Sequence, residues 1–196
     1  FEGKSFGYQG SIAGEVVFNT AMTGYPESLT DPSYKGQILV LTYPIVGNYG
    51  VPNEDTEHKL YRFFESDMLH ISALIISDYS AEYSHWNAQQ SLGDWLKQHK
   101  IPGIYGVDTR HITKLLREKG SMLGKVVFNQ EEPDAYDPNQ ENLVARVSTR
   151  EKEVYGKGKY RILPSMGEED MVPGTYTFFC LSLFSLDPFR LSRKAS

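Results

Sequence analysis

Runs of apolar, β-branched and aromatic residues alternate with polar stretches along the first two thirds of the chain. Four runs predict strands, over residues 13–20, 37–43, 71–77 and 122–128. The run at 37–43 is apolar throughout and ends before Pro44, which is typical of a strand covered on both faces. A short strand is also expected at 104–107, and residues 1–10 resemble the second half of a β-hairpin whose first strand would precede them.

Apolar residues at helical spacing predict three helices. The first covers 56–66, the second 89–100, and the third begins at Asp108 or Thr109, either of which can cap it, and ends before Gly120. Their apolar faces are Leu60, Phe63 and Phe64; Leu92, Trp95 and Leu96; and Ile112, Leu115 and Leu116. Strands alternating with helices predict an α/β fold.

Polar segments separate these elements. Residues 19–37 and 129–142 are expected to be long loops, and LVARVS at 143–148 is a last strand candidate. Residues 155–161 read as an exposed connector, after which an apolar patch at 176–186 precedes a basic end.

Composition narrows the functional classes. The 196 residues include 20 Lys and Arg against 25 Asp and Glu, a formal net charge of −5, and 40% are hydrophobic. A core can therefore form, while binding to a phosphate backbone is not expected. No run of 18 apolar residues suggests a membrane span. The single cysteine, Cys180, rules out a disulfide within the chain and a cysteine-rich zinc site, and suits a reducing compartment.

The densest cluster of polar and turn-forming residues is NTAMTGYPESLTDPSYKGQ, residues 19–37. Hydroxyls and amides in such a loop can bind a small polar ligand. The alternative is a well-capped loop in which Asp31 and Ser33 satisfy local backbone N–H groups, and the residues alone favour that alternative.

Other candidate sites have stronger structural explanations. Asp108, Thr109 and Arg110 stand at a strand-to-helix junction where Arg110 could hold a carboxylate, but capping by Asp108 with Arg110 on a surface or interface is favoured. The histidines lack metal-binding spacing and are expected at the surface or an interface; they are His58, His70, His85, His99 and His111.

Two further motifs favour structural interpretations. Gly156-Lys157-Gly158-Lys159 lacks the Ser or Thr that a phosphate loop requires, so a basic linker is favoured. Cys180 lies in FFCLS, which lacks the sharp turn that exposes an activated thiol.

Two long motifs carry a family resemblance. GEVVFNTAMTGYPESLTDPSYKGQILVLTYPIVGNYGVP and GIYGVDTRHITKLLREKGSMLGKVVF resemble the N-terminal half of the small-subunit, glutamine amidotransferase region of carbamoyl phosphate synthetases. The resemblance covers residues 1–163 and implies a single swivelling β/β/α-type domain with long loops. Residues 164–196 do not resemble the family and are expected to be an irregular tail, disordered or loosely docked.

In that family the amidotransferase triad of Cys, His and Glu belongs to a second domain. Cys180 matches no nucleophile motif, so the resemblance implies that this chain has no catalytic residue and does not hydrolyse glutamine alone. Its role would be to dock the amidotransferase domain onto the large synthetase region and to help form the glutamine site. The Ser of the DPSY motif, Ser33 here, is the implied glutamine contact.

The resemblance also assigns cofactors and pathway. ATP and Mg²⁺ or Mn²⁺ would bind the synthetase region, with no cofactor or metal in this chain and with no nucleic acid or membrane among its partners. Segments such as DYSAEYSHWNAQQSLGDWL are more similar to animal, urea-cycle-type fused enzymes, which implies the mitochondrial matrix, while pyrimidine-pathway relatives imply the cytoplasm. Ala21 departs from the family, where Gly or Ser is common. The rival interpretation is a truncated, non-catalytic interaction or regulatory protein.

Overall fold

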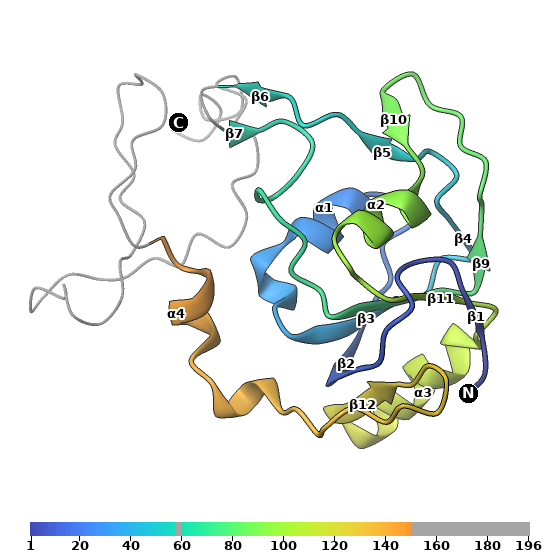
Figure 1. Cartoon of the computed structure of the whole chain (residues 1–196), viewed down its shortest axis with the longest axis vertical. Coiled ribbons are helices and arrows are strands. Elements are labelled where there is room, and N and C mark those ends of the chain that lie inside the picture. Colours follow the sequence, from blue (N-terminus) through green and yellow to red (C-terminus); the bar gives the residue numbers. More distant parts are fainter. Residues whose placement is uncertain (58–59, 150–196) are drawn as a thin grey trace, which may run out of the picture. The chain divides into compact units, whose positions relative to one another are not determined.

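A six-stranded mixed sheet organises the chain (Figure 1). The computed structural model describes residues 1–57 and 60–149, of which Phe1–Val147 form one compact unit. The sheet has the order β1-β11-β8-β3-β2-β12. Its strands are β1 (Lys4–Ser5), β2 (Ile12–Asn19), β3 (Gln37–Leu41), β8 (Ala73–Ile75), β11 (Gly103–Tyr105) and β12 (Met122–Val126).

The four central strands are parallel, and the two edge strands are antiparallel to their neighbours. Within the described residues, three two-stranded ladders lie outside this sheet. They pair β4 (Ile45–Val46) with β9 (Asp78–Tyr79), β5 (Val51–Pro52) with β10 (Ala88–Gln90), and β6 (Thr56–Glu57) with β7 (Leu60–Tyr61). The α/β class expected from the sequence is confirmed.

Helices cover both faces of the sheet, which explains the unbroken apolar run of β3. Along β3, Leu39 packs in the cluster that includes α1 (Tyr25–Thr30) and α2 (Leu92–Gln98), whereas Val40 packs against α3 (Thr109–Lys119). Successive side chains of a strand point to opposite faces, so an apolar residue is needed at every position. Figure 1 shows α1 and α2 on one side of the sheet and α3 on the other.

Local capping sets the starts of two helices, of which only the cap at Asp108 is expected from the sequence. The helix expected over 89–100 is shorter, because Ala88–Gln90 form β10 and α2 begins at Leu92. Ser91 caps α2, since its Oγ accepts a hydrogen bond from Asp94 N at 3.1 Å, and Asp108 caps α3 by accepting from His111 N at 2.9 Å. Gly120 ends α3 with a φ of 81°, a value that disfavours any residue with a side chain.

The helix expected over 56–66 is wrong. The segment instead contains β6 and β7, and Leu60 is exposed. Of Leu60, Phe63 and Phe64, only Phe64 is buried; its ring stacks on Trp95 with centroids 5.5 Å apart and meets Tyr61 edge-on. The helical spacing of Leu60, Phe63 and Phe64 therefore marks one aromatic anchor in an irregular segment.

The strand expected at 143–148 is also wrong, because α4 spans Leu143–Val147. Asn142 accepts a hydrogen bond from Ala145 N at 3.0 Å, and Arg146 pairs with Glu141. These local polar contacts favour helix over the strand preference of a Val-rich run. The preceding segment is largely exposed, as expected, and contains the 3-10 turn η2 (Pro138–Gln140).

The expected long loop at 19–37 is also more ordered than its composition suggests. It contains α1 and the 3-10 turn η1 (Pro32–Tyr34). Pro26 and Pro32 stand in the first turn of these two elements, where a missing N–H costs nothing. The tail expected at 164–196 lies outside the described residues.

Candidate functional site

Ser33 stands in the middle of η1, directly before β3. Asp31 accepts a hydrogen bond from Ser33 N at 2.8 Å, and its carbonyl accepts from Tyr34 N at 3.1 Å. The capping interpretation is thus confirmed for Asp31. The Ser33 side chain is exposed, and its hydroxyl has no hydrogen-bond partner among the described residues. It is free to donate to a carboxylate or to accept from an ammonium group.

A buried network of hydrogen bonds around Thr30 holds the segment that precedes this turn. Thr30, only 2% exposed, donates from Oγ1 to the Pro26 carbonyl at 2.9 Å and accepts from Glu65 N at 3.0 Å. The Ser66 hydroxyl donates to the Thr30 carbonyl at 2.6 Å. The end of α1 is therefore fastened to the 65–66 segment immediately before Asp31.

His70 completes the network and corrects an expectation, because it is buried instead of lying at the surface. Its Nε2 is 3.0 Å from Ser66 Oγ, whose proton is directed to the Thr30 carbonyl, so Nε2 carries the hydrogen. The buried Nδ1 has no partner within the described part of the chain. Burial, followed by the charge of Lys35, lowers the His70 pKa, which favours the neutral ring.

Asn19, at the end of β2, connects the segments around Ser33 through its side-chain amide. Nδ2 donates to Ser28 Oγ at 3.2 Å and to the Tyr34 hydroxyl at 3.1 Å, while Oδ1 accepts from Ala21 N at 2.7 Å. Sequence reasoning did not single out Asn19, Thr30 or His70 as partners of this turn. A polar residue at a strand end was the one available signal for Asn19, and its contacts depend on the tertiary fold.

Carboxylates gather near the turn. Burial raises the Glu27 pKa, and burial together with the charges of Asp31 and Glu27 raises the Glu65 pKa. Lys35 is the cation whose field reaches His70 from the same region. The surroundings of Ser33 are thus polar and mixed in charge.

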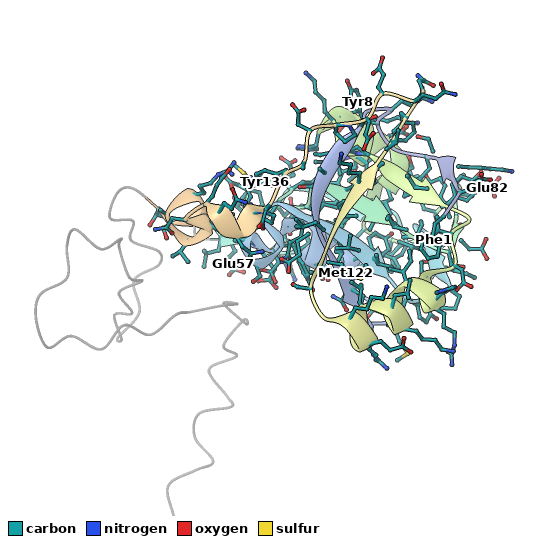
Figure 2. All side chains as sticks on the ribbon, turned by 90° about the horizontal axis from the view of Figure 1, so that it is seen from below. Phe1, Tyr8, Glu57, Glu82, Met122 and Tyr136 are labelled. Atoms are coloured by element: carbon teal, nitrogen blue, oxygen red, sulfur yellow. The ribbon has the colours of Figure 1, made fainter. Side chains whose placement is uncertain are left out.

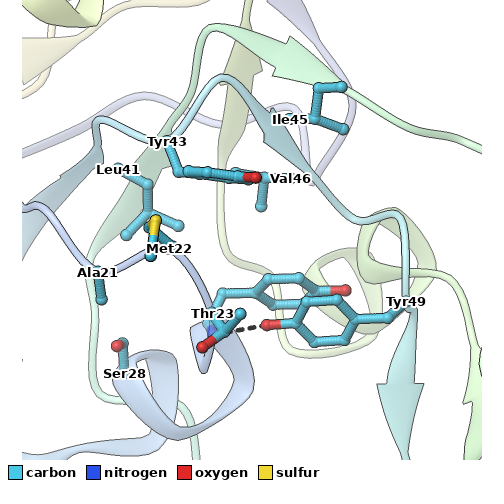
Figure 3. A pocket seen from close by; sticks show the side chains of 10 residues that line it. Ala21, Met22, Thr23, Ser28, Leu41, Tyr43, Ile45, Val46 and Tyr49 are labelled. Carbon is cyan, nitrogen blue, oxygen red and sulfur yellow. Dashed lines mark hydrogen bonds between the residues drawn. The ribbon is translucent and has the colours of Figure 1, made fainter.

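An aromatic and apolar surface lies beside α1, at the carboxyl ends of β2 and β3. Tyr49 stacks on Tyr25 with centroids 4.2 Å apart, and its hydroxyl accepts from Gly24 N at 2.8 Å and Tyr25 N at 3.1 Å, as Figure 3 shows in part. Burial raises the pKa of both tyrosines. Beyond them Met22, Tyr43 and Ile45 are 71%, 39% and 49% exposed and line a shallow hollow (Figure 3).

The Asp108 junction lies at the other edge of the sheet from Ser33. Asp108 follows the carboxyl end of β11, whereas η1 precedes the amino end of β3, and these strands run parallel to their shared neighbour β8. Asp108 caps α3, Thr109 is buried and Arg110 is exposed, so the capping interpretation is confirmed. The structure does not bring these residues to the Ser33 turn.

The remaining candidates supply no second site. His85, His99 and His111 are exposed, as expected, and the described ranges hold no group of His, Cys, Asp and Glu able to bind a metal. His58, the Gly-Lys run at 156–159 and Cys180 lie outside the described residues. No helix in the described part of the chain is long and apolar enough to cross a bilayer.

An open apolar hollow of about 660 Å³ lies between α3, β12 and the residues around β1. Figure 2 views the molecule from this side, with α3 and β12 in front and with Phe1 and Met122 labelled. Its walls are mainly aliphatic side chains, including Val16, Ile75 and Ile104. Glu2, Ser5 and Lys125 also line the hollow, but its aliphatic walls mainly offer apolar burial.

Residues 1–126 match the family model described as the carbamoyl-phosphate synthase small chain, CPSase domain. The chain belongs to this family. It is 53% identical over 159 residues to human "Carbamoyl-phosphate synthase [ammonia], mitochondrial", a match that covers 80% of this chain and 11% of the relative. The recognition made from the two long motifs is therefore confirmed.

The chain is about equally similar to two multifunctional proteins. The chain is 49% identical over 175 residues to "Multifunctional protein URA2" of Saccharomyces cerevisiae, and 50% over 159 residues to "Multifunctional protein CAD" of Squalus acanthias. The matches cover 79% of this chain in both cases, but only 8% and 7% of those relatives. The chain thus spans about a tenth or less of the length of these relatives.

Proposed function

We propose that this chain is the N-terminal domain of the small-chain region of a larger carbamoyl-phosphate synthase, a ligase. Membership of the small-chain family, in relatives that are many times longer, is the observation that carries the proposal. The complete enzyme would make carbamoyl phosphate from glutamine or ammonia, bicarbonate and ATP. ATP and Mg²⁺ or Mn²⁺ would bind its synthetase region, and this chain alone would be inactive.

Within that enzyme, Ser33 would help close the glutamine site. Its exposed hydroxyl is available to the α-amino or α-carboxylate end of glutamine, while a thiolate of the amidotransferase domain attacks the carboxamide. The Asp31 contact holds the Ser33 backbone and leaves the hydroxyl unused. One residue can therefore serve both the turn and a ligand.

Ser33→Ala in the complete enzyme tests this contact. We expect the KM for glutamine to rise about fivefold, the worth of one hydrogen bond, with ammonia-driven synthesis unchanged. Ser84→Ala, another exposed serine, is the matched control and should change neither. Unchanged glutamine kinetics in Ser33→Ala would leave Ser33 as part of a turn only.

Free ammonia is the alternative nitrogen donor, and the name of the human relative contains "[ammonia]". If the complete wild-type enzyme used ammonia but not glutamine, the glutamine role of Ser33 would be wrong while the family assignment stood. Measuring both donors in the wild-type enzyme therefore precedes the variant.

The relatives with mitochondrial names support a mitochondrial matrix location and a role in urea or arginine synthesis. The alternative is a cytoplasmic enzyme of pyrimidine synthesis.

Docking is the second proposed role. The surface of Met22, Tyr43 and Ile45 is apolar and exposed, and residues of these types are common anchors at protein interfaces. We expect it to face the synthetase region or the amidotransferase domain. Amide hydrogen exchange at residues 20–24 and 43–46 should be slower in the complete enzyme than in this chain alone, and equal exchange would contradict the proposal.

The rival function is a non-catalytic interaction or regulatory protein. Mass spectrometry of the native protein separates the two. Peptides that read from residue 163 into an amidotransferase domain would exclude the rival, whereas peptides covering 178–190 would support it. An independent ligand-binding domain is a third possibility, and tight glutamine binding by the isolated chain in calorimetry would favour it over docking.

A further inference from the structure

The side-chain amide of Asn19 makes three hydrogen bonds, two from its nitrogen and one to its oxygen. Ala21 N–H can only donate, so the atom facing it at 2.7 Å is the amide oxygen. The amide nitrogen then faces two hydroxyl oxygens, Ser28 Oγ at 3.2 Å and Tyr34 Oη at 3.1 Å. One side chain thus connects the end of β2 to α1 and to η1.

The bond to Tyr34 bears directly on Ser33. Tyr34 is the next residue, and its half-buried ring packs against the cluster beneath α1 while its hydroxyl reaches the last residue of β2. Asp31 holds the backbone of the turn on the other side. The residues on both sides of Ser33 are therefore held by hydrogen bonds, through Asp31 on one side and through Tyr34 and Asn19 on the other.

The backbone of Asn19 is itself held by the sheet. It pairs with Leu41 in the β2–β3 register, and its carbonyl accepts from Thr42 N at 3.1 Å. A rigid element therefore positions the amide. A ligand-binding hydroxyl on an exposed turn gains the most from such support, because the turn has little burial of its own.

We propose that Asn19 is a positioning residue that orients the Ser33 turn for ligand binding, through its hydrogen bond to Tyr34. This inference rests on the proposed glutamine role of Ser33. Asn19 itself would not touch glutamine.

The amide nitrogen of Asn19 makes two hydrogen bonds, called here the Tyr34 arm and the Ser28 arm. Variants of Asn19, Tyr34 and Ser28 in the complete enzyme separate their effects. Asn19→Ala removes both arms and Tyr34→Phe removes the Tyr34 arm only; each should raise the KM for glutamine about fivefold, with ammonia-driven synthesis unchanged. Ser28→Ala removes the other arm and should leave this KM unchanged. Asn19→Asp should restore a near-wild-type KM, because both hydroxyls can rotate to donate to a carboxylate.

A KM that stays at the wild-type value in both Asn19→Ala and Tyr34→Phe overturns the proposal. Equal rises in Ser28→Ala and Tyr34→Phe also overturn it, because a general loss of stability would then explain the effect. A raised KM in Asn19→Asp would also overturn the proposal, because this variant keeps an acceptor for the Tyr34 hydroxyl.

Ser33→Ala, measured beside these variants, separates this inference from the proposed function. A raised KM in Ser33→Ala with a normal KM in Asn19→Ala rejects only the positioning role. A normal KM in Ser33→Ala rejects the glutamine role and the positioning role with it. Hydrogen exchange at the amides of Ser33, Tyr34 and Lys35 gives an independent readout, and exchange unchanged by Asn19→Ala would show that the amide does not hold the turn.

Discussion

Thr30 and Thr113 form a matched pair that measures what fastens the Ser33 turn to its support. Both are buried helical threonines whose hydroxyl donates to the carbonyl four residues earlier, at 2.9 Å for Thr30 and 2.8 Å for Thr113. Thr30 alone also accepts a hydrogen bond from a distant segment, Glu65 N at 3.0 Å. Replacement by Val keeps the shape and removes the hydroxyl in both cases.

The expected cost follows from which groups lose a partner. In Thr113→Val the carbonyl of Thr109 lies within the α-helix, so the loss is small, below about 1 kcal/mol in the free energy of unfolding. In Thr30→Val the Glu65 N–H loses its acceptor. Glu65 is an exposed residue, but the hydrogen bond to buried Thr30 is partly buried, so its loss adds about 1–2 kcal/mol. For a unit of this size that difference lowers Tm by roughly 2–8 °C.

Urea unfolding of the full chain, followed by tryptophan fluorescence, measures both variants against wild type. Equal m-values are required, so that a shifted midpoint reports stability alone. Equal losses in the two variants would refute the reasoning, since the Glu65 contact would then contribute nothing.

Two further predictions concern the core and its buried histidine. Leu39→Ala, at a side chain with no exposure, should lower the free energy of unfolding by about 2–5 kcal/mol, whereas Leu123→Ala, at a residue 53% exposed, should cost under about 1 kcal/mol; urea unfolding checks both. The folded-state pKa of His70 lies below its ordinary value of 6.5, so its contribution to stability is complete above pH 6.5 and is lost as the pH falls through the folded pKa. His70→Gln should therefore be less sensitive than wild type to acidification below pH 6.5, and identical pH profiles would contradict this.

The strands of the main sheet follow from residue pattern alone. Residues such as Ile38, Leu39 and Val40 are apolar in succession because helices cover both faces, and that rule needs no tertiary information. The start of α3 is also predictable from the sequence, because an Asp directly before a run of apolar residues at helical spacing caps a helix through local contacts.

The errors arose where distant contacts decide local structure. Phe64 is buried because Trp95 lies opposite, a contact that the spacing of residues 60–64 does not reveal. His70 is expected at the surface or an interface because the histidines lack metal-binding spacing, yet it is buried and its ring contacts Ser66, which in turn bonds Thr30. Ser33 was identified through a family motif; Asn19 was missed because its partners lie 9 and 15 residues away, joined by the fold.

The arrangement of the sheet also bears on how the protein is made. β2 pairs with β12, and the hydroxyl of Ser11 accepts from Phe128 N at 2.8 Å across 117 positions of sequence. Likewise, β1 can pair only after its partner β11 has been synthesised. A ribosome must therefore deliver most of this unit before either edge of the sheet can form, which predicts slow, late folding and a nascent chain whose first apolar strands need protection from aggregation.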